Sequence, residues 1–123
     1  MPNFSPTSKK RLSECHDDLQ ILCNELIMLA DITILCGYRG EKEQNEAFDG
    51  GFSKVKWPNS KHNQRPSKAV DIALYPVNWN NIAGFKKLRK FVLAQADRLF
   101  KDGKMKHKIA VISWDLPHYQ IVD

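Results

Sequence analysis

The sequence predicts an α+β fold in which helices pack against a small antiparallel sheet. Apolar residues recur at helical spacing before residue 30 and again between residues 85 and 100, whereas four shorter runs have the alternation or β-branched content of strands. The connection between the last two runs is short, which favours an antiparallel pair. With 123 residues, the chain suits one domain with one core, and we expect residues 1–123 to form it with about residues 1–6 loosely ordered.

The predicted first helix begins at Ser5 and Pro6, which suit the cap and the first helical position, and continues to about Ala30. His16 has polar and acidic neighbours, so we expect a surface histidine. The apolar stripe of this helix should face the core. It contains Leu12, Cys15, Leu19, Leu22, Cys23, Leu26, Ile27 and Leu29.

Four segments are predicted as strands, at residues 32–36, 69–74, 108–113 and 118–122. Between the first two we expect a short helix at residues 41–48, ended by two glycines, and then an irregular loop. An amphipathic helix with a buried stripe between residues 85 and 100 precedes the third strand, and an asparagine before it is available as its cap.

Composition narrows the class of protein. Nineteen Lys and Arg residues against 14 Asp and Glu residues give a formal net charge of +5, which favours an anionic partner such as nucleic acid or a cell wall. No apolar run approaches the roughly 20 residues that span a bilayer, so we predict no membrane insertion. The N-terminal residues lack the apolar segment of a secretory signal, which predicts synthesis in the cytoplasm. Three cysteines cannot all pair, and we expect reduced thiols.

Two histidines and a carboxylate suggest a metal site. His62 and Asp71 lie on either side of a polar turn, with Asp71 inside an apolar strand, and His118 lies near the C-terminus beside Asp115. Imidazole nitrogen and carboxylate oxygen suit catalytic zinc, because three protein ligands leave the fourth position to water. Asp115 would then be free to act as a general base.

Each of these residues also has a structural interpretation when taken alone. A histidine before a strand is often structural, and Asp71 between Val70 and Ile72 could pair with Lys or Arg instead of a metal. A buried carboxylate nevertheless needs some partner, because an isolated buried charge is strongly disfavoured. The residues by themselves leave both interpretations open.

These residues also carry a family resemblance. Ser60-x-His62, Ala69-x-Asp71 and Asp115-x-Pro117-His118, with Gly37-Tyr38-Arg39 upstream and Gln44 behind it, resemble the zinc D-alanyl-D-alanine carboxypeptidase and dipeptidase family. That family also includes phage L-alanyl-D-glutamate endopeptidases and the Hedgehog signalling domain, and the resemblance extends from about residue 34 to residue 119. The chain departs from the usual pattern between His62 and Asp71, where the turn is longer and lacks a glycine.

The resemblance implies a Hedgehog/D-Ala-D-Ala peptidase-like fold and one zinc peptidase catalytic domain. It implies Zn²⁺ held by His62, Asp71 and His118, with Asp115 as the general base and Arg39 stabilising the oxyanion. Further residues are expected to contact substrate. They are Ser60, Gln44, Trp114 and Tyr38.

The implied function is that of a phage endolysin, a bacteriolytic metallopeptidase that hydrolyses the L-Ala–D-Glu bond of peptidoglycan. We expect a monomer that remains in the host cytoplasm until a separate pore-forming protein releases it to the cell wall. A D,D- or L,D-carboxypeptidase or dipeptidase acting on wall peptides is the alternative enzyme, and a zinc-containing wall-binding module is the alternative without hydrolysis. No nucleic-acid motif accompanies the positive charge, so we expect no specific nucleic-acid partner.

Overall fold

The computed structural model describes residues 3–123 and confirms the predicted α+β class. Within that range the chain forms an antiparallel sheet of strand order β1-β2-β4-β3. The strands are β1 (Ile32–Cys36), β2 (Ala69–Leu74), β3 (Ile109–Ile112) and β4 (Asp115–Ile121). The helices are α1 (Pro6–Ser13), α2 (Asp17–Leu29), α3 (Glu41–Asp49) and α4 (Ile82–Lys101), with a short 3-10 helix η1 (Lys61–Asn63).

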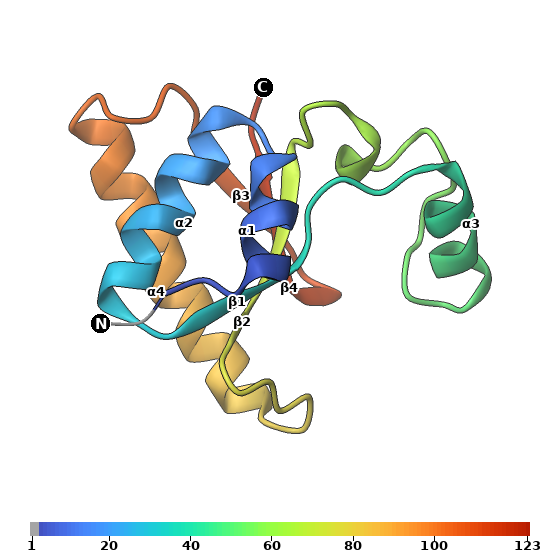
Figure 1. The fold of residues 1–123 in the computed structure, drawn as a ribbon, viewed down its shortest axis with the longest axis horizontal. Coiled ribbons are helices and arrows are strands. Elements are labelled where there is room, and N and C mark those ends of the chain that lie inside the picture. Colours follow the sequence, from blue (N-terminus) through green and yellow to red (C-terminus); the bar gives the residue numbers. More distant parts are fainter. Residues whose placement is uncertain (1–2) are drawn as a thin grey trace.

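Three helices cover the sheet and the fourth stands apart. Helices α2 and α4 pack against each other, α4 contacts β2, β3 and β4, and α1 packs against β1. Figure 1 shows α3 on the other side of the molecule, joined to the rest by the extended segments before and after it. The core therefore lies between the sheet and the three covering helices. Its fully buried members include Leu19, Leu22, Leu26, Ile34, Val70, Ile72, Val92 and Tyr119.

The prediction of one continuous N-terminal helix is wrong, because α1 ends at Ser13 and a separate helix, α2, begins at Asp17. His16 has extended backbone and its Nδ1 accepts a hydrogen bond from the Asp18 amide at 3.0 Å, so it caps α2 instead of lying free on the surface. The amide of His16 donates to the carbonyl of Ser67 at 2.8 Å, and the amide of Ser67 donates to Glu14 at 2.9 Å. Pairing with a distant segment therefore ends α1, while the apolar stripe continues on both sides of the break.

The predicted asparagine cap is confirmed, because Oδ1 of Asn81 accepts a hydrogen bond from the Gly84 amide at 2.9 Å and α4 begins at Ile82. One strand boundary differs from the prediction, since β4 begins at Asp115 rather than His118. Residues 1 and 2 of the predicted loose segment lie outside the described residues, and Ser5 caps α1 through a hydrogen bond from the Ser8 amide. None of the helices formed by the described residues is long and apolar enough to span a membrane.

A buried carboxylate ties the N-terminus of α2 to the loop after α4. Asp18 is 3% exposed. Its Oδ2 accepts hydrogen bonds from the backbone amides of Lys106 at 3.0 Å and His107 at 2.9 Å, and it contacts the His107 Nδ1 at 2.8 Å. Because these amides belong to irregular backbone, the carboxylate supplies acceptors that no helix or strand provides.

We expect Asp18→Ala to lower the free energy of unfolding by about 2 kcal/mol, because it leaves buried backbone donors without an acceptor. Urea denaturation followed by circular dichroism measures the change. Asp17→Ala is the matched control, since Asp17 is exposed in the same helical turn and should cost less than about 1 kcal/mol. Equal losses in the two variants would contradict the assignment of Asp18 as the anchor of this loop.

Candidate metal centre

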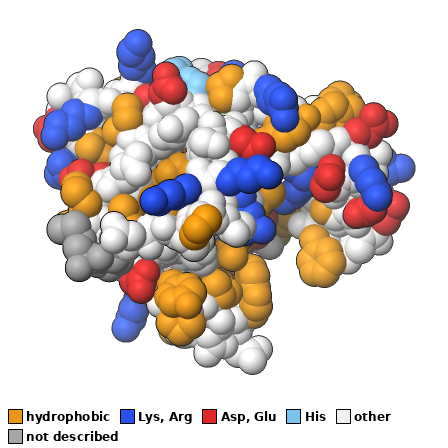
Figure 2. All heavy atoms as spheres, viewed as in Figure 1, with side chains coloured by type: hydrophobic (Ala, Val, Ile, Leu, Met, Phe, Trp, Pro, Cys, Tyr) orange, Lys and Arg blue, Asp and Glu red, His pale blue; other side chains and the backbone are white. Residues whose placement is uncertain are grey.

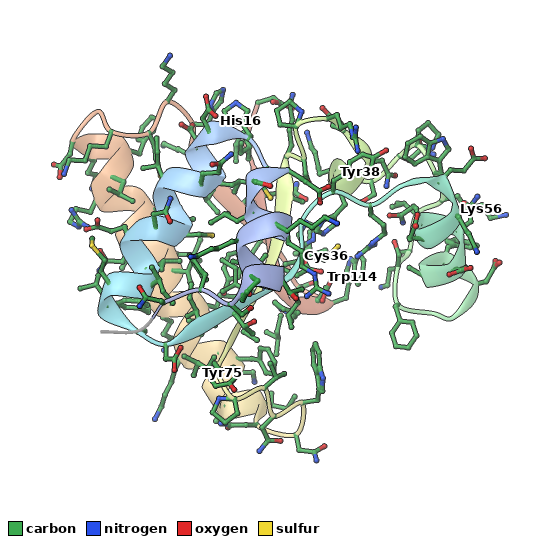
Figure 3. All side chains as sticks on the ribbon, viewed as in Figure 1. His16, Cys36, Tyr38, Lys56, Tyr75 and Trp114 are labelled. Carbon is green, nitrogen blue, oxygen red and sulfur yellow. The ribbon has the colours of Figure 1, made fainter. Side chains whose placement is uncertain are left out.

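A cleft separates the loop after α3 from the end of the sheet. It has a volume of about 260 Å³. Figure 3 labels Cys36, Tyr38 and Trp114 in this region, between the sheet and α3. One wall comes from the segment after α3 and from η1, and the other from β3, β4 and the turn that joins them. The lining residues are Arg39, Phe52, Ser53, Val55, Asn59, Ser60, Lys61, His62, Ile112, Trp114, Asp115, His118 and Gln120.

Asp71 contacts two residues that line this cleft, His62 and His118, and is not itself in the lining. It is 8% exposed, and the antiparallel register of β2 and β4 places it directly opposite His118. Directly opposed residues project to the same face of a sheet, so the pairing brings the carboxylate to that imidazole. The Asp71 Oδ1 lies 3.2 Å from the His62 Nε2 and 3.5 Å from the His118 Nδ1.

Each histidine is held through its other ring nitrogen. The Nδ1 of His62 donates to the Gly37 carbonyl at 2.7 Å, and the Nε2 of His118 donates to the Gln120 Oε1 at 2.8 Å. These bonds assign protons to the outer nitrogens, so in a neutral imidazole the inner nitrogen, on the side of Asp71, is the one that carries the lone pair. Metal-binding histidines are typically oriented by such outer acceptors.

Neither outer acceptor was predicted from sequence. Gln120 follows His118 by two residues on the same strand, so strand alternation could have placed the two side chains on one face. Gly37 contributes only a carbonyl, which leaves no signal in the sequence. Its lack of a side chain is nevertheless required, because a Cβ there would lie 2.3 Å from the Arg11 carbonyl of α1.

Two of the three donor spacings match a zinc ion, those from Asp71 to each imidazole, whereas His62 and His118 do not fall in one group of close donor atoms. Ligand atoms at about 2.0–2.1 Å from a tetrahedral zinc lie about 3.3 Å from one another, and the Asp71 oxygen is 3.2 and 3.5 Å from the two imidazole nitrogens. The imidazole rings of His62 and His118 are 5.1 Å apart between centroids and inclined by 75°. Asp71 belongs to two groups of close donor atoms, one with Cys36 and His62 and the other with Asp115 and His118. The carboxylate therefore links the two halves of the site.

The buried charges stabilise each other. Burial alone would lower the pKa of His62, but the charge of Asp71 and its hydrogen bond outweigh burial and raise it to about 10. Burial alone would raise the pKa of Asp71, but His62 and His118 hold it below its usual range. Without a metal, the carboxylate and the His62 imidazolium therefore form an ion pair.

Asp115 lies at the first residue of β4 and lines the cleft, half-buried. One of its carboxylate oxygens is close to donor atoms of both Asp71 and His118. Burial raises the pKa of Asp115, and the negative charge of Asp71 adds to the shift, although His118, His62 and Arg39 oppose it. A carboxylate with a raised pKa accepts a proton more readily, as a general base must.

Arg39 is held against the same carboxylate. Its guanidinium lies 3.8 Å from the Asp71 Oδ2 and donates to the Gln44 Oε1 at 3.1 Å. Gln44 is fully buried, and its amide nitrogen donates to the Val55 carbonyl at 2.7 Å and to Ser53 at 2.9 Å. The same Gln44 oxygen also accepts from Asn63 at 3.1 Å. Gln44 thus connects Arg39, η1 and the loop after α3, and it does not line the cleft.

Of the other residues predicted to contact substrate, two line the cleft and one does not. Ser60 lines the cleft and caps η1, since its hydroxyl accepts from the His62 amide at 3.2 Å. Trp114 also lines the cleft and is 43% exposed. Tyr38 is outside the lining and lies under the Arg65 guanidinium, 4.4 Å from its ring centroid. Phe52, which was not named among the predicted substrate contacts, lines the cleft and is 80% exposed.

Comparisons with known proteins concern the family and the fold of this chain. A family model described as phage L-alanyl-D-glutamate peptidase matches residues 2–122. The crystal structure of the Serratia marcescens L-Ala D-Glu endopeptidase ChiX is 20% identical, with a TM-score of 0.74 over 98% of this chain and 90% of that chain. The crystal structure of a mutant vancomycin resistance D,D-pentapeptidase VanY in complex with Zn(II) is 18% identical, with a TM-score of 0.52 over 92% of this chain and 71% of that chain. A search of curated proteins gave no match.

The metal-free protein should lose stability on both sides of a weakly acidic optimum. The raised pKa of His62 stabilises the fold fully below the unfolded value of about 6.5, and this contribution is lost as pH rises through about 10. The lowered pKa of Asp71 stabilises the fold above the unfolded value of about 3.9, and that contribution is lost as pH falls. The ion pair should therefore contribute most between about pH 4 and pH 6.5.

Urea titrations of chelator-treated wild type and His62→Gln at several pH values measure this contribution. The stability advantage of the wild type should shrink by more than about 1.4 kcal/mol, the equivalent of one pKa unit, between pH 6 and pH 10. A difference between the two proteins that does not change with pH would contradict the ion pair.

Proposed function

This chain belongs to the phage L-alanyl-D-glutamate peptidase family, and from that membership we propose that it is a zinc-dependent peptidoglycan peptidase cutting the L-Ala–D-Glu bond of the stem peptide. The observation that carries the proposal is the position of Asp71 between two histidines whose outer nitrogens are already held. This arrangement suits a divalent ion, because it places two ring nitrogens within 3.5 Å of one carboxylate oxygen while the outer nitrogens are held by other acceptors.

The proposed zinc ligands are the Nε2 of His62, the Nδ1 of His118 and a carboxylate oxygen of Asp71. A zinc ion bound by these groups would lower the pKa of a coordinated water and polarise the scissile carbonyl. Binding requires His62 to give up its proton, so metal uptake should release protons near neutral pH. Gly37 and Gln120 keep the rings oriented throughout.

Asp115 and Arg39 are proposed to carry the proton transfer and the charge stabilisation. Asp115 accepts the proton of the attacking water and delivers it to the amine of the departing residue, a role supported by its raised pKa and its place in the cleft wall. The Arg39 guanidinium lies on the other side of Asp71, where its positive charge would stabilise the oxyanion that develops on the carbonyl. Gln44 acts through Arg39 by fixing the guanidinium.

The cell wall is the proposed site of action. Peptidoglycan is the substrate of the family, and the net charge of +5 would assist approach to an anionic wall. We propose synthesis in the host cytoplasm, release through a separate pore-forming protein, and action as a monomer. Trp114, Ser60 and Phe52 are the proposed substrate contacts on the cleft surface.

Incubation of the zinc-loaded protein with a defined muropeptide tests the function directly. Mass spectrometry should show a new amino terminus on D-glutamate, and a chelator should abolish the product while added zinc restores it. Release of terminal D-alanine instead would favour the carboxypeptidase, and continued cleavage after verified metal removal would rule out the zinc mechanism.

Metal content of substituted proteins tests the ligand set in the same preparations. His62→Ala and His118→Ala should lower bound zinc well below one equivalent. His107→Ala is the matched control, because it alters a partly buried His–Asp contact outside the cleft and should leave zinc bound. Full zinc content in either ligand variant would remove that residue from the set.

Asp115→Asn should retain zinc and reduce kcat by about 10²- to 10⁴-fold, because the amide cannot accept the proton of the attacking water. Kinetics on the same muropeptide, together with zinc content, measure both quantities. Asp49→Asn, an exposed carboxylate at the end of α3, should leave both unchanged. Turnover of Asp115→Asn within a few-fold of wild type would mean that another group accepts the proton.

A further inference from the structure

A second hollow adjoins the cleft on the outer side of the β3–β4 turn. It has a volume of about 200 Å³ and lies between the start of α4 and the first residues of β4. Large apolar side chains in its walls remain exposed, with Trp79 at 61%, Ile82 at 49% and Trp114 at 43%. Figure 2 shows hydrophobic side chains gathered over the part of the molecule where α4 begins. We call this hollow the indole groove; it is lined by Trp79, Ile82, Phe85, Trp114, Asp115, Leu116 and Pro117.

Trp79 is held in place although its surface is open. Its ring stacks on Phe85 with centroids 5.5 Å apart and planes inclined by 20°, and Phe85 is 7% exposed. The segment that carries Trp79 is fixed in turn by the Asn81 cap of α4. An exposed aromatic ring supported from behind by a buried one is a preformed flat surface, which loses little conformational entropy when a ligand binds.

The groove adjoins the cleft across the β3–β4 turn. Trp114 and Asp115 line both hollows, so the groove lies next to the residue proposed as the general base. Exposed apolar surface beside a proposed catalytic centre is typical of a ligand-binding groove. A group bound in the groove would therefore lie only a few covalent bonds along the substrate from the bond that is cut.

The chemistry of the substrate supplies such an occupant, and this step rests on the proposed function. In peptidoglycan the L-alanine of the stem peptide is joined through a lactyl group to a muramic acid sugar. One residue and one lactyl unit of about 3.5 Å each separate the scissile bond from the sugar. A peptide bound at the metal centre therefore brings its sugar ring to the edge of the cleft.

The groove offers a sugar flat apolar surface. The indole rings present apolar faces to the C–H side of a pyranose ring. Asp115 supplies a carboxylate in the lining. Asn78 and Asn80 flank Trp79 in the chain and are exposed, but they do not line the groove, and Asn78 lines a separate hollow with Leu74, Pro76 and Gly84.

We propose that the indole groove binds the N-acetylmuramoyl sugar on the alanine side of the scissile bond, with Trp79 and Trp114 as its stacking surfaces. The groove thereby makes the enzyme specific for stem peptides that are attached to a glycan. Trp79 is a specificity-determining residue in this assignment, and the metal centre performs the same hydrolysis whether or not a sugar is bound.

Paired substrates test the proposal. One is N-acetylmuramoyl-L-Ala-D-Glu extended by the next stem residues, and the other is the same peptide with an acetyl group in place of the sugar. The wild type should prefer the first by about tenfold in kcat/KM, the effect of one favourable stacking contact. Trp79→Ala should remove this preference mainly through KM. Met28→Ala, which truncates a side chain 51% exposed on α2, should retain it.

The ratio between substrates separates sugar binding from a general loss of folding or catalysis. Equal losses on both substrates in Trp79→Ala and in Ile82→Ser, which leaves the Trp79–Phe85 stack intact, would overturn the proposal. Failure of the wild type to cleave either substrate would instead contradict the proposed function. In that case the groove is judged by binding alone.

Binding is measured by titrating the zinc-loaded protein with the disaccharide N-acetylglucosaminyl-N-acetylmuramic acid, which has no peptide to cleave. The indole N–H signals of Trp79 and Trp114 should shift while that of Trp57 remains in place. Unchanged Trp79 and Trp114 signals at millimolar sugar would overturn the proposal, whatever the catalytic result. A dimer detected by sedimentation and abolished by Trp79→Ala, with no sugar-induced shift, would assign the groove to a second copy and also overturn it.

Discussion

Asp71 places an ionised carboxylate inside an apolar strand, and the positively charged and hydrogen-bonding side chains around the cleft compensate for that charge. A buried charge without partners would cost several kcal/mol, yet Asp71 has His62 on one side, His118 on the other and Arg39 behind it. Each partner comes from a different element, so the carboxylate holds η1, β4 and the segment after β1 together. The same compensation creates the proposed metal site, because a zinc ion would replace the ion pair with stronger interactions of the same groups.

A second layer of hydrogen bonds keeps these partners in position. Gly37 and Gln120 orient the two imidazoles, and Gln44 orients the Arg39 guanidinium. Gln44 also reaches Val55 in the loop after α3. The loop that forms one wall of the cleft is therefore tied to the charged centre, although α3 itself stands apart from the main core (Figure 1). Helix α3 therefore contributes mainly by positioning Arg39 and the cleft wall, and little to the packing of the core.

The turn between β3 and β4 borders both hollows. Asp115 lies near Asp71 and His118, Pro117 lines the indole groove, and Trp114 and Asp115 line both the groove and the cleft. Arg89 of α4 supports the turn, donating to the Asp115 carbonyl at 2.7 Å and to the Leu116 carbonyl at 2.9 Å. The proposed general base and the proposed sugar subsite are thus fixed by one anchored segment.

Local patterns in the sequence were sufficient for the element types, the α+β class and the identity of the charged residues, because periodicity and side-chain chemistry depend on near neighbours. The proximity of His62, Asp71 and His118 depends instead on the register of β2 with β4, which joins residues far apart in the chain. The break between α1 and α2, the burial of Gln44 and the outer bonds to Gly37 and Gln120 are likewise long-range, since each needs a partner from another element. Local spacing determined which groups could do the chemistry, and only tertiary pairing decided which of them meet, because hydrogen bonds and burial act between segments that the sequence separates.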